Sequence, residues 1–436
     1  MMMLWYQLLY PAIAAGVLLR ILLAGRSQAL REGWPEIRQR CGCPAPEKLS
    51  GLDGGETIWI HAASVGEVIA AEPLVRLLAA AEGERRLLMT TSTVAGRERA
   101  AKISGVNAAV LLPMDFLPAV NAFLDRIRPR SLILMEKEFW PMLLHAALGR
   151  GVKVGVANGR ITERSARRYG WIGGLLAASF ARFTRVTAQT DADAERFRSL
   201  GIPAAAVAAT GNMKYDLPMP SAEALAAAQE KLDELGWSES RIWVAGSTRR
   251  GEEEMVLDAF LKAVEKFPNL KLILAPRHTE RSKEVATLLR AKGVRSVSWS
   301  QLLPFQADPA CLLIDTMGVL GALYSTADAA FVGGTLVRVG GHNLLEPAML
   351  AKPVLYGPFT AHTQAVAEAL RAVGGGFVVH NTEELFTELQ RLLQDEDHRR
   401  ATAQKALITA ESFTGATRRT YEHLRPVLEP DKNKET

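Results

Sequence analysis

The first complete strand–turn–helix unit of the chain is residues 57–80, TIWIHAASVGEVIAAEPLVRLLAA. Thr57–His61 is a continuous apolar run, which is typical of a parallel strand that is buried on both faces. Small residues and Gly66 then allow a tight turn, and a helical pattern follows over Glu67–Ala80. This unit predicts a βαβ crossover, the building block of a parallel sheet.

The same pattern recurs along most of the chain. In the first half the predicted strands are Thr57–His61, Leu87–Thr91, Ala108–Leu112, Ser131–Met135, Val152–Ala157 and Arg185–Gln189. In the second half they are Arg241–Ala245, Lys271–Ala275, Cys311–Ile314, Ala329–Val332, Pro353–Tyr356 and Gly376–His380. Helical patterns alternate with them, among others over Ala192–Ser199, Glu252–Lys266 and Ser282–Ala291. We therefore expect an α/β protein with two Rossmann-like domains, each a doubly wound sheet, facing a central cleft.

Domain boundaries follow from composition and length. The chain has 436 residues, which is enough for two or three domains. Residues 212–221 contain two prolines and no helical or strand period, so they predict an interdomain linker. We expect an N-terminal Rossmann-like domain over residues 27–211, a C-terminal one over 222–410, and a C-terminal helix and tail over 411–436.

The N-terminus, residues 1–26, differs from the rest of the chain. Met1–Leu19 contains no charged residue, and the apolar run is only just long enough for the ~20 residues of a spanning helix. Arg20 and Arg26 follow it, so the positive-inside rule predicts that the rest of the chain lies in the cytoplasm. We expect a membrane anchor; an interfacial amphipathic helix or a core helix is the alternative, since Pro11 weakens a straight span.

Charge and cysteine content narrow the class of protein. Lys and Arg total 52 against 47 acidic residues, and the sequence pI is about 9.1, which suits an anionic membrane face or an anionic substrate. The sequence has no zinc-finger spacing and no basic run with interleaved aromatics, so nucleic-acid binding is not favoured. Three cysteines, Cys41, Cys43 and Cys311, supply neither a disulfide framework nor a four-ligand zinc site.

Carboxylates follow two predicted strands of the first half, where doubly wound sheets bind ligands. Glu67 lies in the first helical turn after Thr57–His61 and could act as the general base of an inverting sugar transfer. It could equally complement the helix dipole. Glu136 and Glu138 follow Ser131–Met135, and with strand spacing one of them could lie beside Glu67. A solvated strand end is the alternative.

Glycine-rich segments in the second half suggest an anion site. Residues 246–251, GSTRRG, and 340–347, GGHNLLEP, can bring backbone amides close to a phosphate. Arg277 follows a predicted strand and adds a cation for phosphate or carboxylate, although such an arginine is often merely solvated. Neither segment is GxGxxG or a Walker A loop, so dinucleotide and ATP binding are not favoured.

A metal site is the weaker interpretation of the Asp191-Ala192-Asp193 triplet, because an acidic first helical turn is ordinary dipole complementation. We expect no metal and no cofactor.

Six segments, in order along the chain, resemble motifs of the Kdo transferases, the 3-deoxy-D-manno-octulosonic acid transferases of Gram-negative lipopolysaccharide synthesis. They are His61–Glu67, Met135–Pro141, Gly211–Asp216, Pro276–His278, Asp315–Gly318 and Gly340–Glu346. The resemblance covers essentially the whole chain. It implies a GT-B fold, CMP-Kdo as the donor, lipid IVA (the lipid A precursor) as the acceptor, and action at the cytoplasmic face of the inner membrane.

The resemblance also implies roles for individual residues. By position, Glu67 is the general base, and Glu136 and Lys214 support the transition state. The implied donor contacts are Pro276, Arg277, Met317, Gly318, Val319, Asn343, Leu344, Leu345 and Glu346. The chain departs from the family at three positions: Arg249 stands where His is frequent, Val319 where an acid is frequent, and Leu344 where Pro is frequent. The first departure puts in doubt an imidazole role near the donor.

Arg160, Arg164, Arg167 and Arg168 form a basic cluster that could bind acceptor phosphates or anionic lipid headgroups, or be a solvated face. Two other functions stay open at this stage. One is a GT-B transferase or epimerase that uses a UDP-sugar, and the other is a catalytically inactive membrane scaffold.

Overall fold

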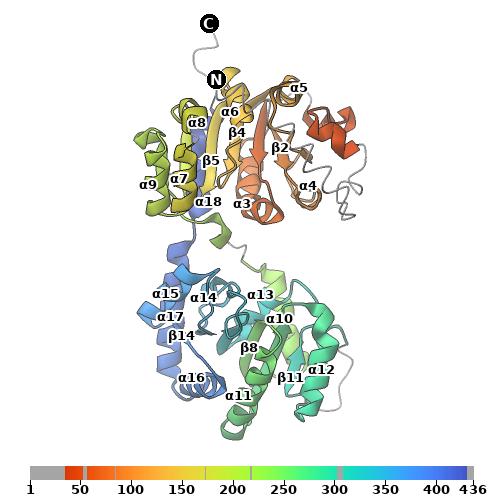
Figure 1. The fold of residues 1–436 in the computed structure, drawn as a ribbon. Coiled ribbons are helices and arrows are strands. Elements are labelled where there is room, and N and C mark those ends of the chain that lie inside the picture. The colour runs from red at the N-terminus through yellow and green to blue at the C-terminus, as the bar shows by residue number, and fades with distance from the viewer. Residues whose placement is uncertain are drawn as a thin grey trace, which may run out of the picture. The chain divides into compact units, whose positions relative to one another are not determined.

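The computed structural model describes residues 35–52, 56–83, 85–171, 173–216, 219–301 and 308–429. These residues form two compact units (Figure 1). The first unit contains the described residues up to Asp216 and those from Thr414 onward, and the second unit is Leu217–Phe413. The predicted anchor, residues 1–26, lies outside the described residues. Among the helices that are described, none has the length and apolar character needed to cross a membrane.

The first unit is built on a parallel seven-stranded sheet in the order β3-β2-β1-β4-β5-β6-β7. Its strands are β1 (Thr57–His61), β2 (Arg86–Thr91), β3 (Ala108–Leu111), β4 (Pro129–Met135), β5 (Lys153–Gly159), β6 (Arg185–Ala188) and β7 (Val207–Ala209). Its α-helices are α3 (Val65–Ala81), α4 (Val94–Ala100), α5 (Leu117–Ile127), α6 (Pro141–Gly149), α7 (Glu163–Trp171), α8 (Gly173–Phe180), α9 (Asp191–Ser199) and α18 (Ala416–Leu428).

Helices cover both faces of this sheet, which explains the continuous apolar strands. Trp59 and Leu132 point into one buried cluster, whereas Ile58 and Ile133 point into the other. The last helix, α18 (blue in Figure 1), completes the second cluster by packing on β5 and β6. Gly155 permits this contact, because a Cβ atom there would lie 2.9 Å from the Leu424 side chain.

The second unit repeats the architecture with a parallel seven-stranded sheet in the order β10-β11-β9-β8-β12-β13-β14. Its strands are β8 (Arg241–Thr248), β9 (Leu270–Pro276), β10 (Ser296–Ser298), β11 (Cys311–Leu313), β12 (Ala329–Val332), β13 (Val354–Tyr356) and β14 (Gly376–Val378). Its α-helices are α10 (Ala222–Glu234), α11 (Glu252–Lys266), α12 (Ser282–Ala291), α13 (Leu320–Leu323), α14 (Leu345–Met349), α15 (Gln364–Val373), α16 (Thr382–Gln394) and α17 (Glu396–Phe413).

The predicted α/β class with two doubly wound sheets is confirmed, and every predicted strand is present. Two further strands, β7 and β10, were not predicted. Each has three residues and lies at the edge of its sheet, so neither carries a long apolar run. Part of the predicted linker is also ordered: Met213–Tyr215 forms a 3-10 helix (η4) that contacts α3 and α18 of the first unit.

Candidate active site

Glu67 lies in the first turn of α3, directly after β1. Ser64 caps the helix by accepting a hydrogen bond from the Glu67 amide, and the Glu67 carboxylate accepts one from the Ala63 amide at 2.8 Å. The Ser64 hydroxyl also donates to Glu67 Oε1 at 3.3 Å. This reciprocal arrangement resembles a capping box, so the dipole-complementing role and a fixed position for the carboxylate occur together.

The surroundings of Glu67 favour its protonated form more than water does. The pKa of Glu67 is raised to about 7, mainly by burial and to a smaller extent by the nearby carboxylates of Glu138 and Glu136, while the Ala63 and Ser64 hydrogen bonds oppose the shift. A carboxyl group that titrates near neutral pH can both take up and release a proton under ordinary conditions, as general acid–base chemistry requires.

Glu136 is placed by a strained backbone conformation at the end of β4. Its φ is 55°, in the left-handed region that non-glycine residues seldom adopt, and its amide still donates to the Ala157 carbonyl at 3.0 Å. β4 ends at Met135, as predicted, so Glu136 and Glu138 do not keep the strand spacing on which their expected orientation was based. Their predicted proximity to Glu67 is nevertheless found, since both carboxylates raise its pKa.

Lys214 completes this group from a distant part of the chain. Its ammonium Nζ donates to Glu136 Oε1 at 2.8 Å. The segment that carries it, η4, is held by two asparagines: Asn212 accepts from the Lys214 amide, and the buried Asn158 accepts from the Met213 amide, each at 3.0 Å. Asn158 also has a left-handed backbone, with a φ of 55°. It was not predicted to belong to the site, although a polar residue directly after the predicted strand Val152–Ala157 was a usable signal.

His61 belongs to the same loop motif as Glu67 but is a core residue. It is fully buried, and its Nδ1 atom lies 3.0 Å from Thr90 Oγ1. Burial lowers its pKa to about 4, so the imidazole is neutral near pH 7.

The basic cluster is exposed on the first unit. Arg164, Arg167 and Arg168 lie on α7, and Arg160 lies three residues before its first residue, Glu163. Tyr169 of α7 donates to the Lys137 carbonyl at 3.0 Å, which ties the helix to the loop between Glu136 and Glu138. One of the four, Arg167, pairs with Glu163 on the helix surface.

The second unit contains a pocket of about 500 Å³ that collects most of its predicted site residues. Five predicted donor contacts line it: Arg277, Met317, Gly318, Asn343 and Glu346. Ser247 and His342 line it as well, and Ser247 has a left-handed φ of 56°. Burial raises the pKa of Glu346, while the Arg277 guanidinium lowers it, so a carboxyl and a cation share this wall.

Four predicted donor contacts are not in the lining of that pocket. Leu344 and Leu345 are fully buried, Pro276 ends β9, and Val319 packs on the core beside α13. The helix that follows Asn343, α14, begins at Leu345 and is only five residues long, and Asn343 Oδ1 accepts from the Leu345 amide.

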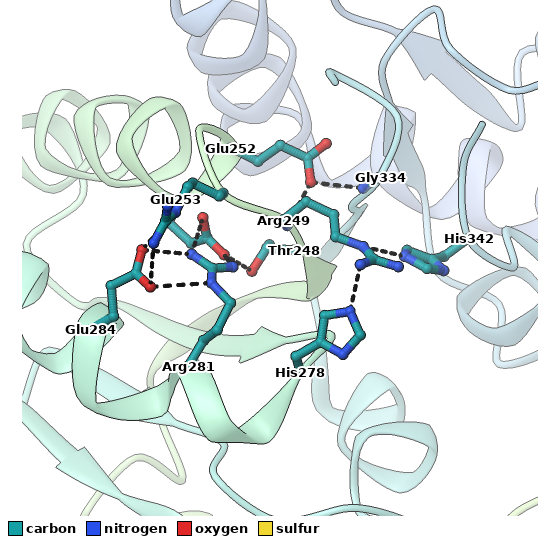
Figure 2. A network of polar contacts seen from close by, with 10 residues as sticks. Thr248, Arg249, Glu252, Glu253, His278, Arg281, Glu284, Gly334 and His342 are labelled. Carbon is teal, nitrogen blue, oxygen red and sulfur yellow. Dashed lines mark hydrogen bonds and ion pairs between the residues drawn. The ribbon is translucent and has the colours of Figure 1, made fainter. Parts of the chain in front are cut away.

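Glu252 joins the glycine-rich segment 246–251 to the loop of residues 333–336, as Figure 2 shows for part of the network. Its fully buried carboxylate accepts four backbone hydrogen bonds of 2.7–3.0 Å, from the amides of Arg249, Gly334, Thr335 and Leu336. The loops are also in close contact, since a Cβ on Gly333 would lie 2.5 Å from the Ser247 carbonyl oxygen. Glu252 was not predicted, because an acid at a helix start ordinarily complements the dipole.

The Asp191–Asp193 triplet has a structural explanation. Thr190 caps α9, and Asp193 is buried, accepting from the Ile161 amide at 3.0 Å and from the Thr190 hydroxyl at 2.7 Å. Across the described ranges, no group of three His, Cys, Asp or Glu residues could hold a metal ion.

The sequence of this chain is similar to those of known proteins over most of its length. Residues 35–217 match the family model described as 3-Deoxy-D-manno-octulosonic-acid transferase (kdotransferase). The chain is 36% identical over 410 residues to the 3-deoxy-D-manno-octulosonic acid transferase of Haemophilus influenzae, covering 91% of this chain and 93% of that protein. It is 33% identical to the enzyme of the same name from Bordetella pertussis, covering 89% and 90% of the two chains.

Among solved structures, the UDP-GlcNAc 2-epimerase of Neisseria meningitidis is similar in fold, with a TM-score of 0.54 over 85% of this chain and 99% of that one. The identity is 14%, so this likeness concerns the fold alone, which is of the GT-B type.

Proposed function

The chain belongs to the 3-deoxy-D-manno-octulosonic-acid (Kdo) transferase family, and we propose that it moves Kdo from CMP-Kdo onto lipid IVA with inversion at the anomeric carbon. It is a glycosyltransferase, because its similarity to transferases of this family extends over nearly their whole length. In this proposal the first unit supplies the base and the second unit binds the donor.

The observation that carries the proposal is the position of Glu67, whose carboxylate is held by the Ala63 amide at the carboxyl end of β1, where such folds bind ligands, and whose pKa is raised to about 7 there. A base in this reaction removes the proton of an acceptor hydroxyl as the hydroxyl oxygen attacks the anomeric carbon. A carboxylate with an ordinary pKa is a weaker base, so burial strengthens Glu67 for this step.

Glu136 and Lys214 are assigned to the transition state. Glycosyl transfer develops positive charge on the sugar ring and negative charge on the departing phosphate. The Glu136–Lys214 ion pair offers one group of each sign, and its Glu136 carboxylate is close enough to Glu67 to raise the pKa of Glu67. Fixed charges of this kind need little reorganisation during the reaction, which is the main source of electrostatic catalysis.

The pocket of the second unit is assigned to CMP-Kdo. Arg277 is a permanent cation for the phosphate, and the partly buried carboxyl group of Glu346 can accept hydrogen bonds from ribose hydroxyls. Exposed apolar surface at Met317, 68% exposed at the pocket edge, can cover a nucleoside. The donor contacts predicted at Pro276, Val319, Leu344 and Leu345 would then be made by backbone atoms.

The acceptor and the membrane complete the proposal. Lipid IVA carries phosphates, and the exposed arginines on and before α7 are suited to bind them. We place the protein at the cytoplasmic face of the inner membrane, anchored by residues 1–26, on the basis of the apolar run and the arginines that follow it. Removal of residues 1–26 should shift the protein from the membrane fraction to the soluble fraction.

The direct test is incubation of the full chain with CMP-Kdo and lipid IVA, followed by the mass of the lipid product. We expect a mass gain of one or more Kdo units and stoichiometric release of CMP. A chain that binds UDP but not CMP in a thermal-shift assay, and transfers nothing from CMP-Kdo, would instead support a UDP-sugar enzyme. Binding of CMP without any transfer would support an inactive scaffold.

A further inference from the structure

Cationic and imidazole side chains gather at one end of the pocket in the second unit. Arg249 lies between two histidines in Figure 2, with its Nε atom 3.2 Å from His342 Nε2 and its Nη1 atom 2.5 Å from His278 Nε2. His342 lines the pocket together with Arg277. The loops therefore bring two arginines to neighbouring positions, one in the pocket wall and one bound to that wall.

The two imidazoles hold the Arg249 guanidinium in place. Arginine has no acceptor atom, so each Nε2 atom accepts and each ring carries its hydrogen on Nδ1. The His342 ring is itself confined, because a Cβ on Gly334 would lie 2.8 Å from its Cδ2 atom. These contacts use two of the five N–H donors of Arg249, and among the described residues its Nη2 group has no partner.

This end of the pocket has more cationic than acidic side chains. Neither Arg249 nor Arg277 forms an ion pair with a carboxylate of the described residues, and Glu252 directs its oxygens to four backbone amides. Glu346 of the same pocket is close enough to Arg277 for the guanidinium to lower its pKa, so one carboxyl group faces two arginines. Burial, followed by the charges of Arg249 and Arg277, lowers the pKa of His342 to about 4. Both guanidinium groups therefore act on the pKa of the same imidazole, so they lie near each other.

We propose that Arg249, positioned by His278 and His342, binds the carboxylate of the acidic sugar in the donor, while Arg277 binds the phosphate. This inference rests on the proposed function. It gives Arg249 a substrate-binding role that the family resemblance does not assign to it.

The chemistry of the donor requires two separate anion contacts. In a CMP-linked ulosonic acid, the carboxylate and the phosphate ester are attached to the same anomeric carbon, so two anions lie next to each other. A guanidinium matches a carboxylate with two parallel N–H bonds, which a lone imidazole cannot do. The hydrogen bond between Arg249 and His278 is exposed and Arg249 itself is half-buried, so a ligand can reach the free N–H groups of the guanidinium. With arginine at this position, the two histidines thus hold one guanidinium that can form two parallel hydrogen bonds to a carboxylate.

The test compares donor and product binding in the full-length enzyme. We expect Arg249→Gln to raise the KM for CMP-Kdo at least tenfold while changing the inhibition constant of CMP less than twofold. Arg277→Gln should weaken the binding of both CMP-Kdo and CMP, because both ligands contain the phosphate. Arg250→Gln is the matched control: its side chain is 77% exposed and pairs with Glu284, so both constants should stay unchanged.

Two results would overturn the inference. An Arg249→Gln variant that loses CMP affinity as strongly as donor affinity would mean that Arg249 acts on the phosphate or on the loop fold. An unchanged KM for CMP-Kdo would mean that it binds no donor group. Arg249→Lys keeps the positive charge but not the two parallel N–H donors, so its KM for CMP-Kdo should lie between those of the wild type and Arg249→Gln. Failure of the wild-type enzyme to transfer Kdo, by contrast, would overturn the proposed function itself.

Discussion

The ammonium of Lys214 lies 2.8 Å from Oε1 of Glu136, although 78 residues separate the two in the chain. Both positions depend on the end of β5, because Ala157 accepts from the Glu136 amide and Asn158 accepts from the Met213 amide. The Lys214 side chain is 42% exposed, and such ion pairs contribute little stability. The contact therefore adds little to the stability of the unit, but it fixes Lys214 against Glu136, whose carboxylate acts on the pKa of Glu67.

Glu136 and Lys214 should behave as one functional group. We expect Glu136→Ala and Lys214→Ala each to lower turnover at least tenfold, and the double variant to be no worse than the weaker single one, because either change removes the pair. Initial rates with saturating CMP-Kdo test this. Lys102→Ala, an exposed lysine elsewhere in the first unit, should keep full activity. Losses that multiply in the double variant would show independent roles.

Glu67 should be needed for transfer but not for nucleotide binding. We expect Glu67→Gln to lower turnover by about 100-fold or more, the range typical of a lost general base. Its CMP affinity should stay unchanged, since the proposed nucleotide site belongs to the second unit. Glu98→Gln, an exposed acid in α4, is the control. A Glu67→Ala variant that keeps a tenth of wild-type turnover would contradict the assignment.

The raised pKa of Glu67 predicts a pH profile. A base acts only when it is deprotonated, so kcat/KM should fall as the pH drops through about 7 and level off above it. An ordinary glutamate would place this inflection near pH 4.5. The residual activity of Glu67→Gln should lack the inflection. The same inflection in that variant would assign it to another group.

Glu252 should matter for the second unit as a whole. Glu252→Gln replaces one acceptor oxygen by an amide donor that faces backbone N–H groups, so at least one buried hydrogen bond is lost. We expect the free energy of unfolding to drop by about 2–3 kcal/mol, with weaker CMP binding. Urea titration and CMP titration measure both. Glu254→Gln, exposed on the same helix, should have no effect, and equal stability of both variants would contradict this role.

The sequence by itself was sufficient for the fold class and the family. Strands such as Ile58–Ile60 are apolar at every position because helices cover both faces of the sheet, and this burial is visible in the local composition. The order of the six motifs indicated the family before any contact was known. Short edge strands such as β7 were not predicted, because three residues are too few to show a strand pattern.

The supporting contacts of the site were decided by the tertiary structure alone. Asn158 meets Met213 across 55 residues, and Glu252 meets Gly334 across 82, and no periodicity in the sequence reports such pairs. They follow from which strands lie next to each other and where each strand ends, and so does the position of Arg249 between His278 and His342. Local patterns record how deeply a segment is buried, whereas the partners of a loop side chain depend on the packing of the entire sheet.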